Sequence, residues 1–461
     1  MPADRRDQVR DAARYLRSVR PLDPAELTDY VEGDVDAATV RADLRALAPT
    51  LAIVERPDGS FVPVPEGPVA PPTTDVEGLP PALETVIEDR LATTYGPDWA
   101  TGETGDHLRS TIEALKADYY RQHPVEYDTD VANAYAIYHL ASYYAAGYHV
   151  AAELAAADLL DHHLRILDVG AGVGGPALGL FAAVPEDTLI EYHAIEPGAG
   201  ADVLEALLAE TGPNVHPTIH RTTAEAYELT SSFDVVLFAN VLSELDDPVA
   251  VTERYLDAVT RSGTMVLLAP ADEGTSTGLR TVERALVDDR ELATVYAPTV
   301  RLWPDAHPTD RGWSFVRHDN VTAPTFQTRL ARGEDAYRHT SVQYSYAYLR
   351  RDGRRRYDVT LSADAAAKMG AMDAHVTNRV DVVAAKLSPD LGTDHPLFKV
   401  SDGSEAVDHY AVLVHESPLT ETLTTADYGA LLAFENVLVL WNDDEDGYNL
   451  VVDDRAVVDY Y

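Results

Sequence analysis

A glycine-rich stretch that follows an apolar run constrains the fold of this chain more than any other feature of its sequence. The run Leu164-Arg-Ile-Leu-Asp-Val169 leads into Gly170-Ala-Gly-Val-Gly174, and apolar residues at helical spacing come next. This order predicts a strand, a tight turn and the start of a helix, which is where α/β folds bind nucleotides. Glycines allow the backbone to approach a ligand closely, and the first turn of a helix offers unpaired N–H groups and a partial positive charge. We therefore expect a nucleotide site at this turn.

Two acidic residues indicate which nucleotide suits the turn. The glycine spacing also matches the dinucleotide pattern GxGxxG, so the glycines do not decide by themselves. Asp168 stands immediately before the turn, where a carboxylate suits the cationic amino group of a methionine moiety and would repel a pyrophosphate. Glu196 ends the next apolar run, where ribose hydroxyls need a two-oxygen acceptor. The combination resembles the S-adenosylmethionine (SAM)-dependent methyltransferases; NAD-type binding and a site that has lost its ligand are the alternatives.

Later apolar runs follow in the order expected of a methyltransferase domain. Candidate strands at 215–220, 233–240 and 263–269 would continue the sheet, and ligands bind outside the carboxyl ends of such strands. Asn240 and Ser243 would then border the methyl acceptor and are the candidate catalytic residues, although polar residues at a strand-to-helix turn can be purely structural. The candidate cofactor-binding residues are Asp168, Gly170, Gly172, Gly174, Glu196, Ala224 and Asn240.

The amino-acid composition excludes several kinds of metal site and indicates the cellular compartment. The 461 residues include no cysteine, which excludes disulfides, zinc–thiolate sites and iron–sulfur clusters held by thiolates. The net charge is −41 while the hydrophobic content is an ordinary 46%, so the chain should fold. An acidic, lysine-poor, folded chain indicates adaptation to a high-salt cytosol, with an acidic protein of ordinary cytosol as the alternative. With no signal peptide and no apolar stretch of ~18 residues, we expect a cytoplasmic protein that does not contact membranes.

The chain is expected to be an α/β protein with smaller modules around a central Rossmann-like SAM methyltransferase domain. The N-terminal module would contain three helices and a hairpin around Asp58-Gly59, and such a module docks to a partner, binds nucleic acid or only completes the fold. The expected segments are a winged-helix-like module (1–66), a helical segment (79–160), the SAM-binding domain (161–298), a basic extension (299–360) and a small β-rich C-terminal domain (390–461).

One helix of the helical segment carries a stripe of tyrosines. At helical spacing such a stripe is usually part of a core, and a stacking platform for a substrate base is the other interpretation. The tyrosines are Tyr135, Tyr138, Tyr143, Tyr144 and Tyr148.

The basic extension stands out in so acidic a chain. Residues 299–360 contain 11 arginines and 7 acidic residues, and five of the arginines follow the aromatic run 344–348. Guanidinium groups beside aromatic rings are typical of nucleic-acid binding, although a charge run can also be a solvated face. The candidate RNA-binding residues are Arg350, Arg351, Arg354, Arg355 and Arg356.

Several stretches in the same order resemble one family. They include Leu79-Pro-Pro-Ala-Leu83, Asn240-Val-Leu-Ser-Glu-Leu245, Gly312-Trp-Ser-Phe315 and Tyr344-Ser-Tyr346. Over roughly residues 79–360 the chain resembles the methyltransferase-like assembly factors of the mitochondrial small ribosomal subunit, with their bacterial and archaeal relatives. The resemblance implies a SAM-binding protein that acts on small-subunit ribosomal RNA or on the assembling small subunit. A non-catalytic assembly factor and a small-molecule SAM-dependent methyltransferase are the alternatives.

The chain also departs from this family. Relatives carry cysteines in a Pro-Cys-Pro-His and a Trp-Cys-His-Phe segment, thought to hold an iron–sulfur or other metal centre, and usually a histidine in place of Asn240. Here the first segment reads Trp303-Pro-Asp-Ala-His307-Pro308 and Ser314 replaces the second cysteine. We expect packing of Trp303, Trp313 and Phe315 instead of a metal centre. A hard-metal site is disfavoured for the oxygen and nitrogen ligands nearby, which are Asp305, His307, Asp310 and His318.

Overall fold

A computed structural model describes residues 4–121 and 125–461 of the chain. They divide into two compact units. The first comprises Met1–Leu237 and Asn320–Thr340, and the second comprises Phe238–Asp319 and Ser341–Tyr461. The stretch 299–360, expected to form one basic extension, is therefore divided between the two units. The central part of this stretch, Asn320–Thr340, belongs to the first unit.

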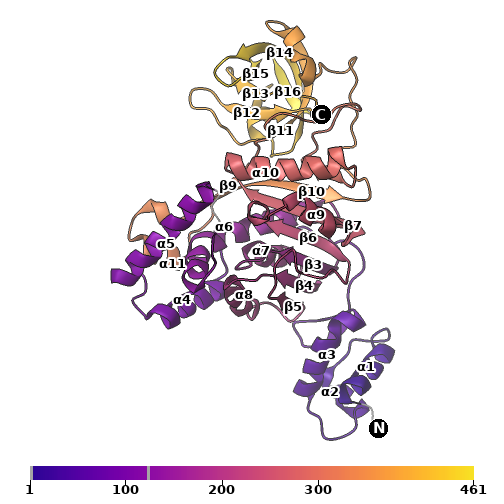
Figure 1. Cartoon of the computed structure of the whole chain (residues 1–461). Coiled ribbons are helices and arrows are strands. Elements are labelled where there is room, and N and C mark those ends of the chain that lie inside the picture. Colours follow the sequence, from indigo (N-terminus) through magenta and orange to yellow (C-terminus); the bar gives the residue numbers. More distant parts are fainter. Residues whose placement is uncertain (1–3, 122–124) are drawn as a thin grey trace. The chain divides into compact units, whose positions relative to one another are not determined.

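The N-terminal module of the first unit is a small helical body with a hairpin (Figure 1). Asp36 caps its third helix by accepting the N–H of Thr39 at 2.7 Å, as an N-cap aspartate is expected to do. Arg45, on the exposed side of this helix, pairs with the buried carboxylate of Glu55, so the guanidinium is already engaged within the module. The elements are α1 (Arg5–Leu16), α2 (Pro24–Leu27), η1 (Thr28–Tyr30), α3 (Ala37–Leu51), β1 (Ile53–Glu55) and β2 (Phe61–Pro63).

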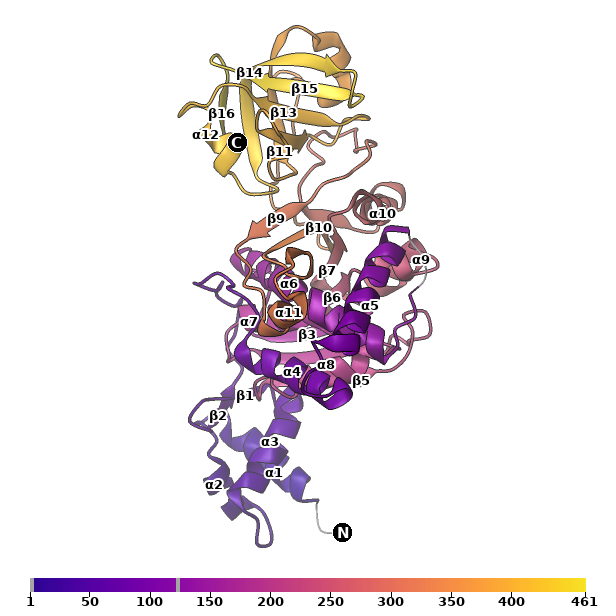
Figure 2. The ribbon, with the colours of Figure 1, turned by 90° about the vertical axis from the view of Figure 1, so that its left-hand side faces the viewer.

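A helical layer follows, and part of the divided stretch packs into it. Gln327 donates to the backbone oxygen of Ile137 at 2.9 Å, and Thr325 donates to Glu84 through its N–H and its hydroxyl. These bonds hold α11 against α4 and α6 (Figure 2). The elements are α4 (Pro81–Tyr95), α5 (Gly102–Arg121), α6 (Thr129–Ala156), α11 (Thr325–Ala331) and η4 (Asp335–Tyr337).

The sheet is mixed and Rossmann-like, which confirms the α/β class. Its order is β5-β4-β3-β6-β7-β10-β8, with β9 paired to β10. Strands β3, β4 and β5 are parallel, with Asp168 opposite Ala194 and Ile195 opposite His220, whereas β10 is antiparallel to β7. The elements of the first unit are β3 (His163–Val169), α7 (Gly175–Ala183), β4 (Leu189–Ile195), α8 (Gly200–Leu208) and β5 (Val215–His220).

The division between the units falls within β6, and the remaining strands belong to the second unit. The elements from this point are β6 (Phe233–Ala239), η2 (Leu242–Glu244), α9 (Pro248–Leu256), β7 (Val259–Pro270), α10 (Glu273–Arg284), a π-helical turn η3 (Ala285–Asp289), β8 (Thr294–Ala297), β9 (Val316–Asp319) and β10 (Ser341–Arg350).

The C-terminal part is a small β-barrel. Strand β11 pairs with both β12 and β14, which closes the ring β11-β12-β13-β15-β14, and β16 pairs with β14. Leu432, Phe434 and Leu450 lie in its buried core. The expected boundary at residue 390 is too late, because β11 precedes it. The elements are η5 (Met369–His375), β11 (Arg379–Lys386), β12 (Leu397–Ser401), β13 (His409–Leu413), α12 (Glu421–Thr425), β14 (Leu431–Asn442), β15 (Gly447–Val452) and β16 (Val457–Tyr460).

None of the helices described is long and apolar enough to cross a lipid bilayer.

Candidate functional site

The glycine-rich turn between β3 and α7 has the backbone that the sequence predicts. Gly170, Gly172 and Gly174 have φ values of 69°, 54° and 82°, a left-handed region that other residues adopt only with strain. The N–H groups of Gly170 and Ala171 donate to the backbone oxygen of Ile195 at 2.9 and 3.0 Å, which fixes the turn against the end of β4. Open space surrounds the position that a Cβ of Gly172 would take. The turn thus leaves room for a ligand at the N-terminus of α7.

Glu196, directly after β4, lies against this turn. Its Oε2 accepts the N–H of Gly172 at 2.8 Å, and its Oε1 accepts the N–H of Gly198 at 2.7 Å. Each carboxylate oxygen retains a further lone pair for a ligand hydroxyl. Ala224 follows β5, the strand beside β4, and is buried. Since β3, β4 and β5 are parallel, the residues that follow them lie along the same edge of the sheet.

Asp168, the penultimate residue of β3, is buried with 1% of its surface exposed. Its carboxylate accepts the hydroxyl of Tyr192 at 2.8 Å, and no ion pair involving it is found among the described residues. Burial, with a smaller contribution from the negative charge of Glu196, raises the pKa of Asp168 to about 7. A buried carboxylate without a counter-charge is a suitable partner for a cationic group of a ligand. Tyr192 was not anticipated from the sequence, where only its place in an apolar run was visible.

Asn240 and Ser243 belong to the second unit and follow β6. Asn240 has a left-handed φ of 61°, and its N–H donates to the backbone oxygen of Leu268 at 3.0 Å. Its side-chain Oδ1 is buried and has no hydrogen-bond partner among the described residues. Strained backbone and unsatisfied buried polar atoms are features of functional sites. Ser243 lies in η2 and is exposed.

The candidate RNA-binding arginines differ in their accessibility. Arg350 is buried, with 1% of its surface exposed, and it donates to Thr264 Oγ1 at 2.8 Å and to the backbone oxygen of Ser262 at 2.9 Å. The expectation that it binds RNA is therefore wrong, because its guanidinium serves to hold the end of β10. Arg351, Arg354 and Arg355 are exposed and Arg356 is half-buried.

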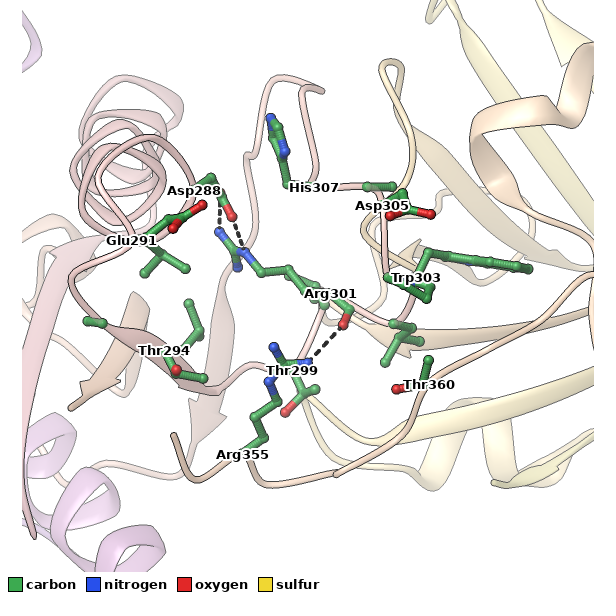
Figure 3. Close-up of a pocket in the computed structure, with 17 residues that line it drawn as sticks. Asp288, Glu291, Thr294, Thr299, Arg301, Trp303, Asp305, His307, Arg355 and Thr360 are labelled. Carbon is green, nitrogen blue, oxygen red and sulfur yellow. Dashed lines mark hydrogen bonds and ion pairs between the residues drawn. The ribbon is translucent and has the colours of Figure 1, made fainter. Parts of the chain in front are cut away.

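A cavity of about 590 Å³ lies in the second unit and includes one of these arginines (Figure 3). Arg355 donates to the backbone oxygen of Arg301 at 3.3 Å. Arg301 in turn pairs with Asp288 through two nitrogens, at 2.7 and 2.6 Å. Asp305 and His307 also line this cavity, but no group of three or more His, Asp or Glu side chains suited to a metal ion is found in the part of the chain that the structure describes.

Buried charges and hydroxyls occupy the region where the resemblance would place cysteines. Ser314 is buried, and its Oγ accepts hydrogen bonds from Arg280 at 3.1 Å and from the hydroxyl of Tyr428 at 3.2 Å. Asp310 is buried beside Lys399, whose Nζ lies 2.7 Å away. The tryptophans contribute polar contacts as well as packing. The Nε1 of Trp303 donates to Asp402 at 2.6 Å and that of Trp313 to the backbone oxygen of Ala271 at 2.8 Å, and the ring centroids of Trp313 and Phe315 lie 5.4 Å apart.

Three family models match separate parts of the chain. Residues 129–299 match the family described as mitochondrial small ribosomal subunit Rsm22. Residues 6–57 and 370–461 match the N-terminal and C-terminal domains of a domain of unknown function, DUF8157. A search of curated proteins found no match to the sequence.

A search of solved structures matched several methyltransferases. The plantazolicin methyltransferase BpumL in complex with a monoazolic desmethylPZN analog and SAH is 12% identical, with 58% of this chain and 95% of that chain covered and a TM-score of 0.30. The mitomycin 7-O-methyltransferase MmcR is 14% identical, with 63% and 87% covered and a TM-score of 0.25. A SAM-dependent methyltransferase from Aquifex aeolicus is 16% identical, with 29% and 73% covered and a TM-score of 0.24.

Proposed function

We propose that this chain, which carries an Rsm22 family domain over residues 129–299, binds SAM and methylates RNA of the small ribosomal subunit. The observation that supports SAM binding most strongly is the pairing of Glu196 with Gly172 beside a left-handed glycine turn. The carboxylate of Glu196 after β4 suits the ribose of a ligand, and the open glycine backbone after β3 suits the methionine moiety of the same ligand.

Each candidate residue then has a definite task. Glu196 accepts hydrogen bonds from the ribose hydroxyls, and Asp168 accepts one from the ammonium group. The backbone of Gly170, Gly172 and Gly174 encloses the ligand between these two carboxylates. Ala224 lies beside the adenine. In the second unit, Asn240 and Ser243 remain the candidate catalytic residues. When bound, SAM supplies a methyl group that is already activated by the sulfonium. The chain has only to align the acceptor and exclude water, and orientation of this kind contributes ~7–11 kcal/mol.

The RNA assignment rests on the family description and on charge. The matched family is described as mitochondrial small ribosomal subunit Rsm22, and Arg351, Arg354 and Arg355 are exposed in a chain of net charge −41. We assign these arginines, with Arg356, to phosphate contacts in a high-salt cytosol, where such contacts are weaker than at low salt. The N-terminal module is assigned a docking role as a winged-helix-like unit.

Transfer of labelled methyl from SAM to purified immature small subunits in molar potassium chloride tests the proposal. The full-length chain is compared with Glu196→Ala. Label in the RNA that is lost in the variant supports an RNA methyltransferase. Absence of label, with the protein still bound to the particle, would favour a non-catalytic assembly factor. Absence of both label and binding would favour a small-molecule methyltransferase.

A further inference from the structure

The tyrosines of α6 fall into two groups. Tyr144 and Tyr148 are buried, whereas Tyr135, Tyr138 and Tyr143 are only half-buried. Two of the half-buried rings, Tyr135 and Tyr143, belong to a continuous aromatic row that we define as Tyr127, Tyr135, His139 and Tyr143. The ring of His139 stacks on that of Tyr143, with centroids 5.3 Å apart and planes inclined by 18°. Tyr135 lies 4.7 Å from His139, and Tyr127 lies 6.1 Å from Tyr135.

Close backbone packing positions this row beside the candidate cofactor turn. A Cβ on Gly179 of α7 would lie 1.9 Å from the backbone oxygen of Tyr144, so only glycine lets the two helices approach this closely. As a result Tyr143 lies beside Gly175, the first residue of α7. A Cβ on Gly175 would be 3.3 Å from the Cβ of Tyr143.

The other end of the row reaches the loop of Glu196. The backbone oxygen of Tyr127 accepts the N–H of Ala199 at 3.2 Å, and a Cβ on Gly198 would lie 3.1 Å from the Cβ of Tyr127. The aromatic row therefore extends from the N-terminus of α7 to the carboxylate expected to hold the ribose. All of these residues belong to the first unit.

Polar groups accompany the rings. The ring centroids of His339 and Tyr138 lie 4.1 Å apart in an edge-on arrangement, and the backbone N–H of His339 donates to Gln327 Oε1 of α11 at 3.1 Å. Burial lowers the pKa of His139 to about 3 and that of His339 to about 4, so both imidazoles are neutral near pH 7 and can accept as well as donate hydrogen bonds. The Nζ of Lys116 lies 4.1 Å from the ring centre of Tyr138 and adds a positive charge in a chain that has four lysines.

We infer that the aromatic row is the acceptor site of the proposed methyltransferase and binds one unstacked nucleobase of the RNA. Half-buried planar rings next to the methyl donor suit a base, because every base has a π-face that stacks on tyrosine or histidine. The neutral imidazoles can form hydrogen bonds with the donor and acceptor groups on the edge of the base, and the ammonium group of Lys116 can pair with the adjoining phosphate. The inference rests on the proposed function and adds the residues that select the acceptor.

Short single-stranded oligoribonucleotides that carry one 2-aminopurine test the inference with the full-length chain, since stacking quenches the fluorescence of this base. Tyr135→Leu and Tyr143→Leu remove a ring but keep apolar bulk, and Tyr135→Phe and Tyr143→Phe keep the ring. Tyr15→Leu, which removes a tyrosine that is 75% exposed on α1, is the matched control. The affinity of each protein for SAH is measured in parallel by calorimetry.

We expect the wild type, the Phe variants and the control to quench the fluorescence. Each Leu variant should bind the oligonucleotide about tenfold more weakly, the size of effect that one base–ring stack supplies. Affinity for SAH should stay unchanged. Equal binding by Leu and Phe variants would overturn the inference, and so would a parallel loss of SAH affinity, which would assign the row to the cofactor. Equally tight binding of the free 2-aminopurine riboside would overturn the RNA assignment. Failure of the wild type to bind SAH, with quenching intact, would reject the proposed function and leave the base site standing.

Discussion

Tyr192 donates its hydroxyl to Asp168 across 2.8 Å, and both side chains are buried in neighbouring parallel strands. The bond satisfies one lone pair of the carboxylate but supplies no positive charge. The folded chain thus holds a desolvated acid at the place where the methionine end of SAM is expected to lie. Such an arrangement lowers the stability of the free protein while favouring a cationic ligand.

Replacing Asp168 by asparagine should stabilise the free protein at alkaline pH. The pKa of this carboxyl is 3.8 in its ordinary state and about 7 in the fold, so the folded chain holds the proton over a range in which the unfolded chain has lost it. Stability contributed by the protonated acid is therefore lost as pH rises from about 4 to about 7. Asp168→Asn does not ionise and should be more stable at pH 8 by a few kcal/mol, with little difference near pH 4. Thermal unfolding in molar potassium chloride measures this; a less stable variant at pH 8 would show that the carboxylate has a cationic partner.

Affinity for SAH should depend on pH through the same carboxyl. Binding of the ammonium group requires the ionised acid, so affinity should fall about tenfold per pH unit below 7 and level off above it. Calorimetry between pH 5.5 and 7.5 stays below the range in which the amino group of the ligand, which carries a free carboxylate beside it, loses its proton. Asp168→Asn should bind weakly at every pH of this range. An equal slope in the variant would assign the titration to another group.

Glu196→Ala should weaken binding of SAM by at least tenfold. The substitution removes the expected ribose acceptor, and it also removes the acceptor of the Gly172 and Gly198 N–H groups. Glu196→Gln, which keeps one side-chain oxygen, is the matched variant and should lose less. Calorimetry in high salt separates the cases, and unchanged affinity in Glu196→Ala would reject the ribose assignment.

Removing three arginines together should weaken association with RNA, most strongly at low salt. The variant with alanine at positions 354, 355 and 356 loses up to three phosphate contacts. The negative slope of log affinity against log salt should therefore become shallower by about 2. A variant with Arg56, Arg261 and Arg290 changed to alanine removes the same charge from other exposed positions. Filter binding at several salt concentrations compares them. Full retention in the first variant, or equal loss in both, would contradict specific contact by the 354–356 arginines.

Local patterns predicted the glycine turn and Glu196, because strand, turn and helix follow one another within about thirty residues. What the sequence did not reveal depends on distant partners. Arg350 looks like part of a solvated charge run, yet it ends the buried strand β10 and bonds to Thr264 on the neighbouring strand β7. Tyr192 meets Asp168 only through the register of two strands. The closure of the barrel by β11 and β14 likewise needs a pairing of segments that are about fifty residues apart in the sequence.

Substitution of Lys399, a buried lysine of the second unit, is expected to lower the stability of the protein strongly. Lys399 Nζ lies 2.7 Å from Asp310 and 2.6 Å from Asp408, and all three side chains are buried. Although burial alone would raise it, the pKa of Asp310 lies well below its usual range because of Lys399 and Arg284. Lys399→Met leaves two buried carboxylates without this cation and should cost about 3–5 kcal/mol of unfolding free energy.

The pH dependence of Lys399→Met distinguishes electrostatics from packing. In the wild type, stability from the depressed pKa of Asp310 is present above the ordinary carboxyl pKa and is lost as pH falls into the acid range. The variant lacks much of that contribution, so its deficit should shrink as pH is lowered. Arg317→Ala breaks an exposed pair with Asp319 and should change stability by less than about 1 kcal/mol at any pH. Denaturant unfolding at pH 7 and pH 2.5 measures both, and a deficit in Lys399→Met that is the same at the two pH values would indicate lost packing instead of lost charge.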